Sequence, residues 1–244
     1  MLFKKKVKST FDTDVPKIIV GRKEGNGDYY DRLKDNVIYY SDNGKNKIFQ
    51  IESSVSGEGK STVAINLSVA LAKSGKKVCV LDLDFRRPKI HRSFDIPNHS
   101  GIAEYMLGEC TKEELIKTTE YGVDVINRGK STQNTAIIFT SDKFKEMMVE
   151  LREEYDIILL DCPPVLLVSD YIHISKFSDA VLFIVLSGVT HRAQLKDSIE
   201  LLQRNDVNIF GIAMTYKNGS KFNRASYYNS GYYKYSKYKY SEEN

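Results

Sequence analysis

The chain of 244 residues carries a formal net charge of +4, and 41% of its residues are hydrophobic. These values are typical of an ordinary globular protein, so they exclude disorder along the whole length, and the mild charge gives no argument for nucleic acid. No stretch approaches the ~20 apolar residues of a membrane span. Three cysteines without paired spacing favour a reducing compartment.

Residues 1–26 are polar and basic, and we expect them to form an arm outside the core. A short helix is predicted from residue 28 to about residue 40. From residue 47 onward, short apolar runs alternate with helical patterns, which is typical of a parallel sheet buried on both faces. The predicted strands cover residues 48–52, 78–81, 123–126, 157–160, 180–186 and 209–214.

Helices are predicted between these strands. The first covers about 60–74 and ends at Gly75, a residue suited to the left-handed position after a helix. A second begins near Ser141 with an amphipathic stripe at 144, 147, 148 and 151, and a third begins at Thr190. The alternation predicts an α/β fold over residues 27–216, with a doubly wound, mostly parallel sheet and its ligand at the carboxyl ends of the strands.

The sharpest pattern is IESSVSGEGKST, residues 51–62, between the first predicted strand and the first helix. Gly57 and Gly59 allow backbone N–H groups to close around phosphate oxygens, Lys60 can reach the β- and γ-phosphates, and Ser61 can hold Mg²⁺. The strict motif has glycine where this chain has Ser54. Because the string lies in the strand-loop-helix context that the motif requires, we interpret it as a phosphate loop.

Three acidic residues follow two other predicted strands. Asp82 and Asp84 come after the second strand, and Asp161 comes after the fourth. A single acid in such a place is most often a solvated strand end. Because strand ends converge on the phosphate crevice in a doubly wound sheet, we expect these three to serve Mg²⁺, its waters and proton transfer.

Two neighbouring sequence features leave alternatives open. Arg86 and Arg87 could stabilise charge on a transferred phosphoryl group or form structural salt bridges. We expect Cys162 to be a small buried residue rather than a nucleophile, because no histidine lies beside it in the sequence.

At this point the sequence resembles the bacterial tyrosine kinases (BY-kinases). SSVSGEGKST resembles their Walker A motif, in which serine often replaces the first glycine; VLDLDFRRPKIHRSFDIPN resembles Walker A′, and IILLDCPPVLLVSD resembles Walker B. SGVTHRAQL at 187–195 and the tyrosine-rich C-terminus complete the resemblance, which covers nearly all of residues 28–244. It implies an ATP- and Mg²⁺-dependent protein-tyrosine kinase that regulates capsule or exopolysaccharide synthesis and export.

The resemblance also implies roles for individual residues. Lys60 would bind the β- and γ-phosphates, Ser61 would ligate Mg²⁺, Asp82 would be the base for the tyrosine hydroxyl, and Asp84 and Asp161 would serve the metal. The nucleotide would be bound by Ser56, Gly57, Glu58, Gly59, Lys60, Ser61 and Thr62.

Partners follow from the same resemblance. It implies a transmembrane polysaccharide co-polymerase or adaptor whose cytoplasmic segment activates the kinase, a cognate tyrosine phosphatase and a homo-oligomer, with a cytoplasmic protein recruited to the inner face of the membrane. The family's oligomerisation motif, E-x-x-R-x-x-R, aligns with Asp28, Asp31 and Lys34, so ring formation is in question.

The nearest alternative is an ATPase switch similar to MinD and ParA, which share the fold. Their signature lysine would fall at Val55, so it is missing here. The chain also departs from the bacterial tyrosine kinases at Thr215, which stands where asparagine is common near the nucleotide base. A nucleotide-binding module that has lost catalysis is a third possibility.

The C-terminal residues 217–244 have almost no aliphatic side chains, so we expect a flexible tail. Lysines between its tyrosines give the unmodified tail a positive balance, attractive to an acidic site. We expect modification in trans by an adjacent subunit; the alternative is a low-complexity tail that binds sugars, nucleic acid or membrane. The candidate phosphoacceptors are Tyr227, Tyr228, Tyr232, Tyr233, Tyr235, Tyr238 and Tyr240.

Overall fold

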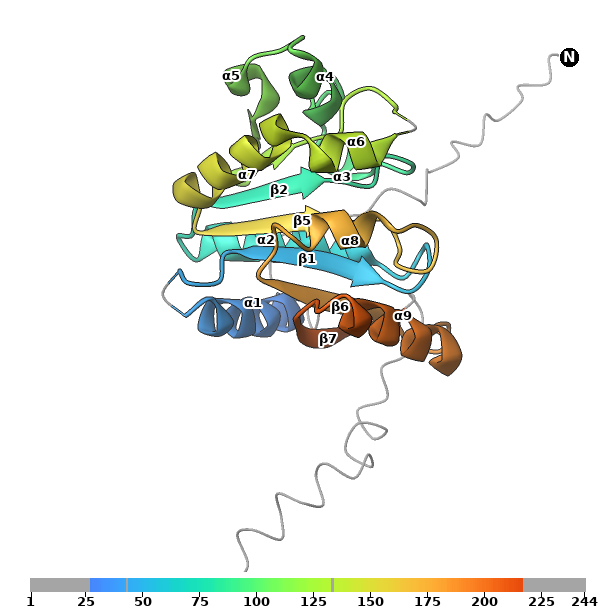
Figure 1. The fold of residues 1–244 in the computed structure, drawn as a ribbon. Coiled ribbons are helices and arrows are strands. Elements are labelled where there is room, and N and C mark those ends of the chain that lie inside the picture. The colour runs from blue at the N-terminus through green and yellow to red at the C-terminus, as the bar shows by residue number, and fades with distance from the viewer. Residues whose placement is uncertain (1–26, 43, 133, 217–244) are drawn as a thin grey trace, which may run out of the picture.

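The computed structural model describes residues 27–42, 44–132 and 134–216. Within these ranges seven strands form one sheet in the order β3-β4-β2-β5-β1-β6-β7, and helices flank it (Figure 1). Every strand pair is parallel except that of β3 with β4. The predicted fold class, a doubly wound and mostly parallel α/β domain, is therefore confirmed.

The strands agree closely with the sequence pattern. Each predicted strand lies within one residue of its expected bounds, whereas the two-residue β3 was not predicted because it is too short to show a period. Their bounds are β1 (Ile48–Ser53), β2 (Val78–Asp82), β3 (Lys117–Thr118), β4 (Val123–Ile126), β5 (Ile157–Asp161), β6 (Ala180–Leu186) and β7 (Ile209–Thr215).

The longer helices are those that the sequence predicted. They are α1 (Gly27–Ser41), α2 (Lys60–Lys73), α7 (Asp142–Glu154) and α9 (Arg192–Arg204). Short helices that the sequence did not predict are α3 (Ile90–Ser93), α4 (Ile102–Leu107), α5 (Lys112–Leu115), α6 (Thr135–Thr140) and α8 (Asp170–Ile174). No helix in the described ranges is long and apolar enough to cross a bilayer.

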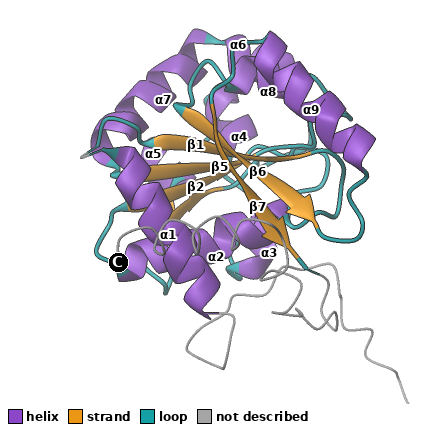
Figure 2. Ribbon diagram, turned by 90° about the horizontal axis from the view of Figure 1, so that it is seen from below, coloured by secondary structure: helices purple, strands orange, loops and turns teal. Residues whose placement is uncertain are grey.

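Helices cover both faces of the sheet, with α1, α2 and α3 on one side and α6, α7, α8 and α9 on the other (Figure 2). The predicted stripe of α7 is wholly buried, and Ser141 begins this helix by accepting the N–H of Phe144 at 3.2 Å. Gly75 takes the expected left-handed conformation after α2, with φ of 88°. Because both faces are covered, all residues of β1, β2, β5 and β6 are buried.

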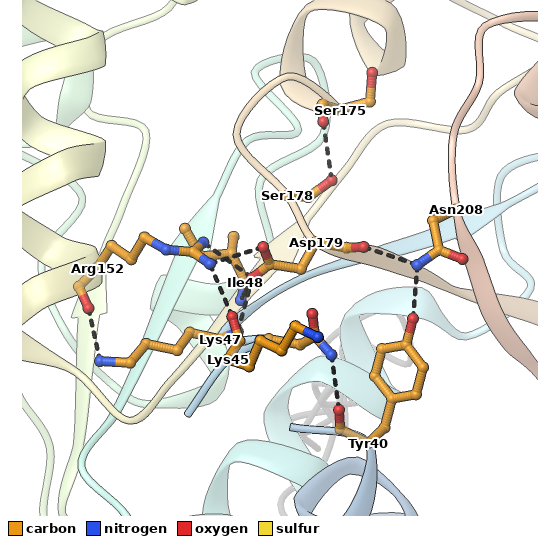
Figure 3. Close-up of polar contacts among 10 residues, drawn as sticks. Tyr40, Lys45, Lys47, Ile48, Arg152, Ser175, Ser178, Asp179 and Asn208 are labelled. Atoms are coloured by element: carbon orange, nitrogen blue, oxygen red, sulfur yellow. Dashed lines mark hydrogen bonds and ion pairs between the residues drawn. The ribbon is translucent and has the colours of Figure 1, made fainter. Parts of the chain in front are cut away.

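A cluster of hydrogen bonds and an ion pair links the amino-terminal ends of β1 and β6 to neighbouring helices (Figure 3). The carboxylate of Asp179 accepts the backbone N–H of Lys47 at 2.7 Å and that of the next residue at 2.9 Å. Arg152 of α7 holds the same carboxylate with two N–H groups, at 2.8 and 2.9 Å. Asn208 then joins the Asp179 carbonyl to the Tyr40 hydroxyl of α1. This cluster ties α1, α7, β1 and β6 together at the end of the sheet away from the phosphate loop.

Candidate functional site

The chain leaves β1 into a loop of residues 54–59 and enters α2 directly at Lys60. Gly57 and Gly59 have φ of 84° and 98°, in the left-handed region where a side chain is strained. A Cβ on Gly59 would also lie 3.2 Å from the methyl group of Thr215. The first backbone N–H groups of a helix lack intrahelical partners, so this geometry presents an anion-binding turn at the end of β1.

Lys60 lies beneath this loop and is only 7% exposed. Its Nζ donates to the hydroxyl of Ser53 at 3.0 Å, and that hydroxyl donates to the carbonyl of Val55 at 2.9 Å. The ammonium group is thus held at the base of the loop, where a phosphate oxygen can replace Ser53 as its acceptor.

Two carboxylates face this loop from adjacent strands. Asp82 ends β2, Asp161 ends β5, and the two residues are directly opposite each other in the parallel register. Both are buried, at 0% and 1% exposure. Asp84 lies two residues farther on, is half-buried, and accepts the backbone N–H groups of Arg86 and Arg87 at 3.1 and 3.0 Å. The structure therefore brings together the three acids that the sequence singled out.

The carboxyl groups of Asp82 and Asp161 have fewer hydrogen-bond partners among the described residues than their buried oxygens could accept. Asp82 accepts the N–H groups of Lys89 and Ile90 through Oδ2, both at 3.2 Å, but its Oδ1 is buried without a partner among the described residues. Neither oxygen of Asp161 has a well-formed hydrogen bond to the part of the chain that the structure describes, although Ser61 lies close enough to lower its pKa. Buried polar atoms are normally paired, so unpaired ones mark a place built for something else.

The electrostatics of the site follow from this burial. Burial raises the pKa of Asp161 to about 7, against the opposing effects of Lys60 and Ser61. Burial also raises the pKa of Asp82 well above its usual range, with further increases from Asp161 and Asp84. The site thus places three carboxyl groups, those of Asp82, Asp84 and Asp161, near one ammonium group, that of Lys60. A divalent cation fits this imbalance and the hard oxygen donors.

The donor set suits Mg²⁺ bound together with phosphates rather than an ion caged by protein alone. Across the described ranges, no three His, Cys, Asp or Glu side chains are arranged to hold a metal ion. Mg²⁺ commonly keeps several waters and takes only one or two carboxylates plus substrate phosphates. Ser61, Asp84 and Asp161 offer that smaller number of ligands.

Sequence reasoning missed Glu52, one residue before the end of β1. Its side chain is fully buried, and Oε1 accepts the amide of Gln50 at 3.3 Å while Oε2 has no partner in the described structure. Burial raises its pKa well above the usual range, opposed first by the charge of Lys60. An acid inside a strand covered on both faces was the signal, because such strands are otherwise apolar.

The remaining candidates are an arginine, a cysteine, the other residues of the phosphate-loop motif and the C-terminal tyrosines. Of the open alternatives for Arg86, the structure shows the ion pair, 2.8 Å from the buried Asp170. Cys162 is buried, as expected. In the loop, Ser56 is exposed, Ser61 and Thr62 are half-buried, and Glu58 is buried with its side chain turned onto protein partners. The tyrosine candidates lie outside the described residues, and the catalytic and binding roles stay predictions.

Comparison with known proteins identifies the class. The AAA domain family matches residues 46–208, which is more than half of the chain and includes the loop and all three acids. The phosphate loop after the first strand and the acidic ends of neighbouring strands agree with this match. The chain is therefore a nucleotide-binding protein of the AAA domain family.

The relatives narrow the identification. The chain is 32% identical to the tyrosine-protein kinase YwqD of Bacillus subtilis over 207 residues, which is 84% of this chain and 87% of that protein. It is 26% identical to the putative tyrosine-protein kinase CapB of Staphylococcus aureus, over 88% of this chain and 91% of the relative. The chain belongs to the family of bacterial tyrosine-protein kinases.

Solved structures agree with this assignment. The chimerical protein CapA2B2 superposes with a TM-score of 0.75 at 30% identity, covering 79% of this chain and 85% of that one. The kinase domain of the Escherichia coli tyrosine kinase ETK gives 0.74 at 26% identity, covering 80% and 78%. The chain spans only 23% of the full-length E. coli relative, which is much longer.

The alternative family shares the architecture. The septum site-determining protein MinD of Pyrococcus horikoshii, solved with Mg-ADP, superposes with a TM-score of 0.60 at 23% identity, over 72% of each chain. At that identity the likeness concerns the fold alone.

Proposed function

We propose that this protein binds ATP with Mg²⁺ at residues 54–62 and transfers the γ-phosphoryl group to tyrosines of its C-terminal segment, residues 217–244. The observation that carries this proposal is the buried pair Asp82 and Asp161, which lie opposite each other in the sheet, have oxygens without a partner among the described residues, and include an acid close to the buried Lys60. We assign catalysis to residues 27–216 and treat residues 1–26 and 217–244 as segments outside that domain.

The loop residues supply the binding energy for the triphosphate. Lys60 would exchange Ser53 for the β- and γ-phosphate oxygens, and the N–H groups of residues 56–62 would close around the phosphates. Mg²⁺ held by Ser61, Asp84 and Asp161 would neutralise charge on the phosphate oxygens. Binding of a cation also favours the ionised form of Asp161, which burial disfavours in the free protein.

In this proposal Asp82 receives the proton of the tyrosine hydroxyl. In the transfer, the phenolic oxygen forms a bond to the γ-phosphorus, the bond from that phosphorus to the bridging oxygen breaks, and ADP leaves. The phenolic proton passes to Asp82. A phenol has a pKa near 10, so a carboxylate with a raised pKa is a better acceptor for its hydrogen than an ordinary one. The unpaired Oδ1 is the atom available for this contact.

The acceptor segment supplies an electrostatic switch. Lys234, Lys237 and Lys239 lie among its tyrosines, so the unmodified segment is attracted to the acidic site. Each phosphorylation adds about −1.5 to −2 charges, and two or three would reverse that balance. We propose modification in trans, with release of the segment after several transfers.

Assembly and location follow as further parts of the proposal. As the membership of the bacterial tyrosine kinase family implies, we propose a role beside a membrane adaptor in capsule or exopolysaccharide production. The adaptor's cytoplasmic segment would activate the kinase and recruit it to the inner face of the membrane, and a phosphatase would reverse the modification.

In α1, Lys34 pairs with Asp31 at 3.8 Å and with Asp35 at 3.2 Å. These charges are therefore partly satisfied within one subunit. We propose a homo-oligomer that is held more weakly than one built on the family's arginines.

The decisive experiment incubates the purified full chain with ATP and Mg²⁺, with and without the cytoplasmic segment of the adaptor, and maps phosphate by mass spectrometry. We expect phosphotyrosine within residues 217–244, lost in Lys60→Met and Asp82→Asn. Replacing the seven candidate tyrosines by phenylalanine is the matched control, since nucleotide binding should persist. ADP release without phosphotyrosine, even with the adaptor segment, would favour the MinD-like ATPase instead.

A further inference from the structure

Glu58 presents a physical problem, because a carboxylate stands in the middle of a loop that must bind a highly charged anion. Unit charges a few ångströms apart inside a protein repel strongly, since the local dielectric is far below that of water. Glu58 is nevertheless buried, at 1% exposure, one residue before the helix-starting glycine. Its side chain must therefore be held in a way that leaves the loop attractive to phosphate.

The carboxylate is fixed by two different segments. Oε2 accepts the backbone N–H of Val55 at 2.9 Å, across the loop, and Oε1 accepts the hydroxyl of Thr190. Thr190 lies between β6 and α9, and its oxygen in turn accepts the backbone N–H of Leu186 at 2.9 Å. The side chain thus fastens the phosphate loop to the end of β6, so its position depends on a residue far away in the sequence.

A second hold acts on the backbone of the same residue. The hydroxyl of Thr215 donates to the carbonyl of Glu58 at 2.7 Å, and its methyl group lies over Gly59. Thr215 is the last residue of β7, so the loop is fastened to the strand that leads toward the tyrosine-bearing segment. At the start of the loop, the Ser53 hydroxyl donates a further hydrogen bond to the Val55 carbonyl.

We propose that Glu58 is a positioning residue for nucleotide binding, held by Thr190 and Thr215 so that its carboxylate shapes the loop without repelling the triphosphate. Thr190 and Thr215 are then parts of the nucleotide site although neither contacts a phosphate. The proposal rests on the proposed nucleotide site and not on the tyrosine-kinase step.

The test measures the affinity of the full-length protein for a fluorescent ADP analogue with Mg²⁺. Thr190→Val removes the donor and leaves the carboxylate one hydrogen bond short, free to turn toward the phosphates. We expect about tenfold weaker binding, equivalent to about 1.4 kcal/mol. The KM for ATP should rise with little change in kcat, because the ground state and the transition state are affected alike.

Three further variants make the outcome specific. Thr190→Ser keeps the hydroxyl and should restore the affinity. The double variant Glu58→Gln, Thr190→Val should bind more tightly than Thr190→Val alone, because the repelling charge is gone. Thr118→Val is the matched control, since it removes a threonine–carboxylate hydrogen bond to Asp124 at the distant β3 edge.

The results separate this inference from the proposed activity. If Thr190→Val binds within twofold of wild type, or the double variant binds more weakly than Thr190→Val, the positioning role is overturned while the kinase assignment stands. Should Thr190→Val fail to fold, Thr215→Val serves the same purpose, because it removes the donor to the Glu58 carbonyl and keeps the methyl group. Wild-type protein that binds no nucleotide would overturn both proposals.

Discussion

We expect Asp161 to lower the free energy of unfolding of the nucleotide-free protein at pH values where it is ionised. Its carboxylate is buried there without a well-formed hydrogen bond to the described residues. Its pKa is raised from 3.8 to about 7, mainly by burial. A difference of about three in pKa corresponds to about 4 kcal/mol in the free energy of ionisation. Because the neighbouring acids titrate together with it, we expect Asp161→Asn to recover about 2–4 kcal/mol of unfolding free energy at pH 8.

The sign of the pH dependence follows from proton binding. Between about pH 4 and pH 7 the folded state keeps a proton on Asp161 that the unfolded chain has already released. The free energy of unfolding therefore falls as the pH rises through this window, and the loss is complete above pH 7. Asp161→Asn lacks this loss, so it should be more stable than wild type at pH 8 and close to wild type near pH 4.

Thermal unfolding in the presence of a chelator, followed by circular dichroism at pH 4.5 and pH 8, measures the effect. For a chain of this size we expect the midpoint of Asp161→Asn to exceed that of wild type by roughly 5–10 °C at pH 8 and by far less at pH 4.5. Mg²⁺ with ADP should stabilise wild type more than the variant, because the variant keeps the phosphate loop but lacks one carboxylate for the cation. An equal gain at both pH values, or a loss at pH 8, would refute the reasoning.

Three further outcomes are expected. Gly59→Ala should lower nucleotide affinity by at least about tenfold in a binding titration, because φ is 98° and Thr215 lies 3.2 Å from the new Cβ. The affinity for Mg²⁺ with ADP should fall between pH 8 and pH 6, since protons compete for Asp161. Asp179→Ala should lower the free energy of unfolding by about 2–4 kcal/mol in denaturant titrations, because it removes the partner of Arg152 and two backbone N–H groups. It should leave nucleotide affinity unchanged, because Asp179 lies at the amino-terminal ends of β1 and β6, whereas the phosphate loop follows the carboxyl end of β1.

Most strands could be predicted from the sequence because they are short, largely apolar runs, and β1, β2, β5 and β6 are buried along their whole length. The same rule placed Asp82 and Asp161 together, since the carboxyl ends of parallel strands meet at one edge of a sheet. The short helices α3 to α6 and α8 could not be predicted. A helix of four to six residues shows too few turns for an apolar period, so its ends depend on tertiary contacts.

The side-chain roles were harder to predict than the strand ends. Glu58 occupies a position of the phosphate-loop motif at which any residue is allowed, so the motif assigns it no role. Its partners Thr190 and Thr215 lie 132 and 157 residues away in the sequence. Sequence spacing contains no information on such pairs. Thr215 was considered only for the nucleotide base, whereas the structure shows it on the loop backbone. Glu52 was hidden for a different reason, because it was counted as the last residue of an apolar strand.

The buried acids of the site lower the free energy of unfolding of the domain when no ligand is bound. Glu52, Asp82 and Asp161 are each buried with at least one oxygen that has no partner within the described ranges, and burial is the largest cause of the raised pKa of all three. A core selected for stability alone would pair or replace them, as buried polar atoms elsewhere in proteins are paired. The arrangement is consistent with a domain that reaches its full stability only with a cation and nucleotide bound, because bound charge removes the cost that burial imposes. Under the proposed function, the same acids would attract the lysine-bearing segment of residues 217–244 once they are ionised.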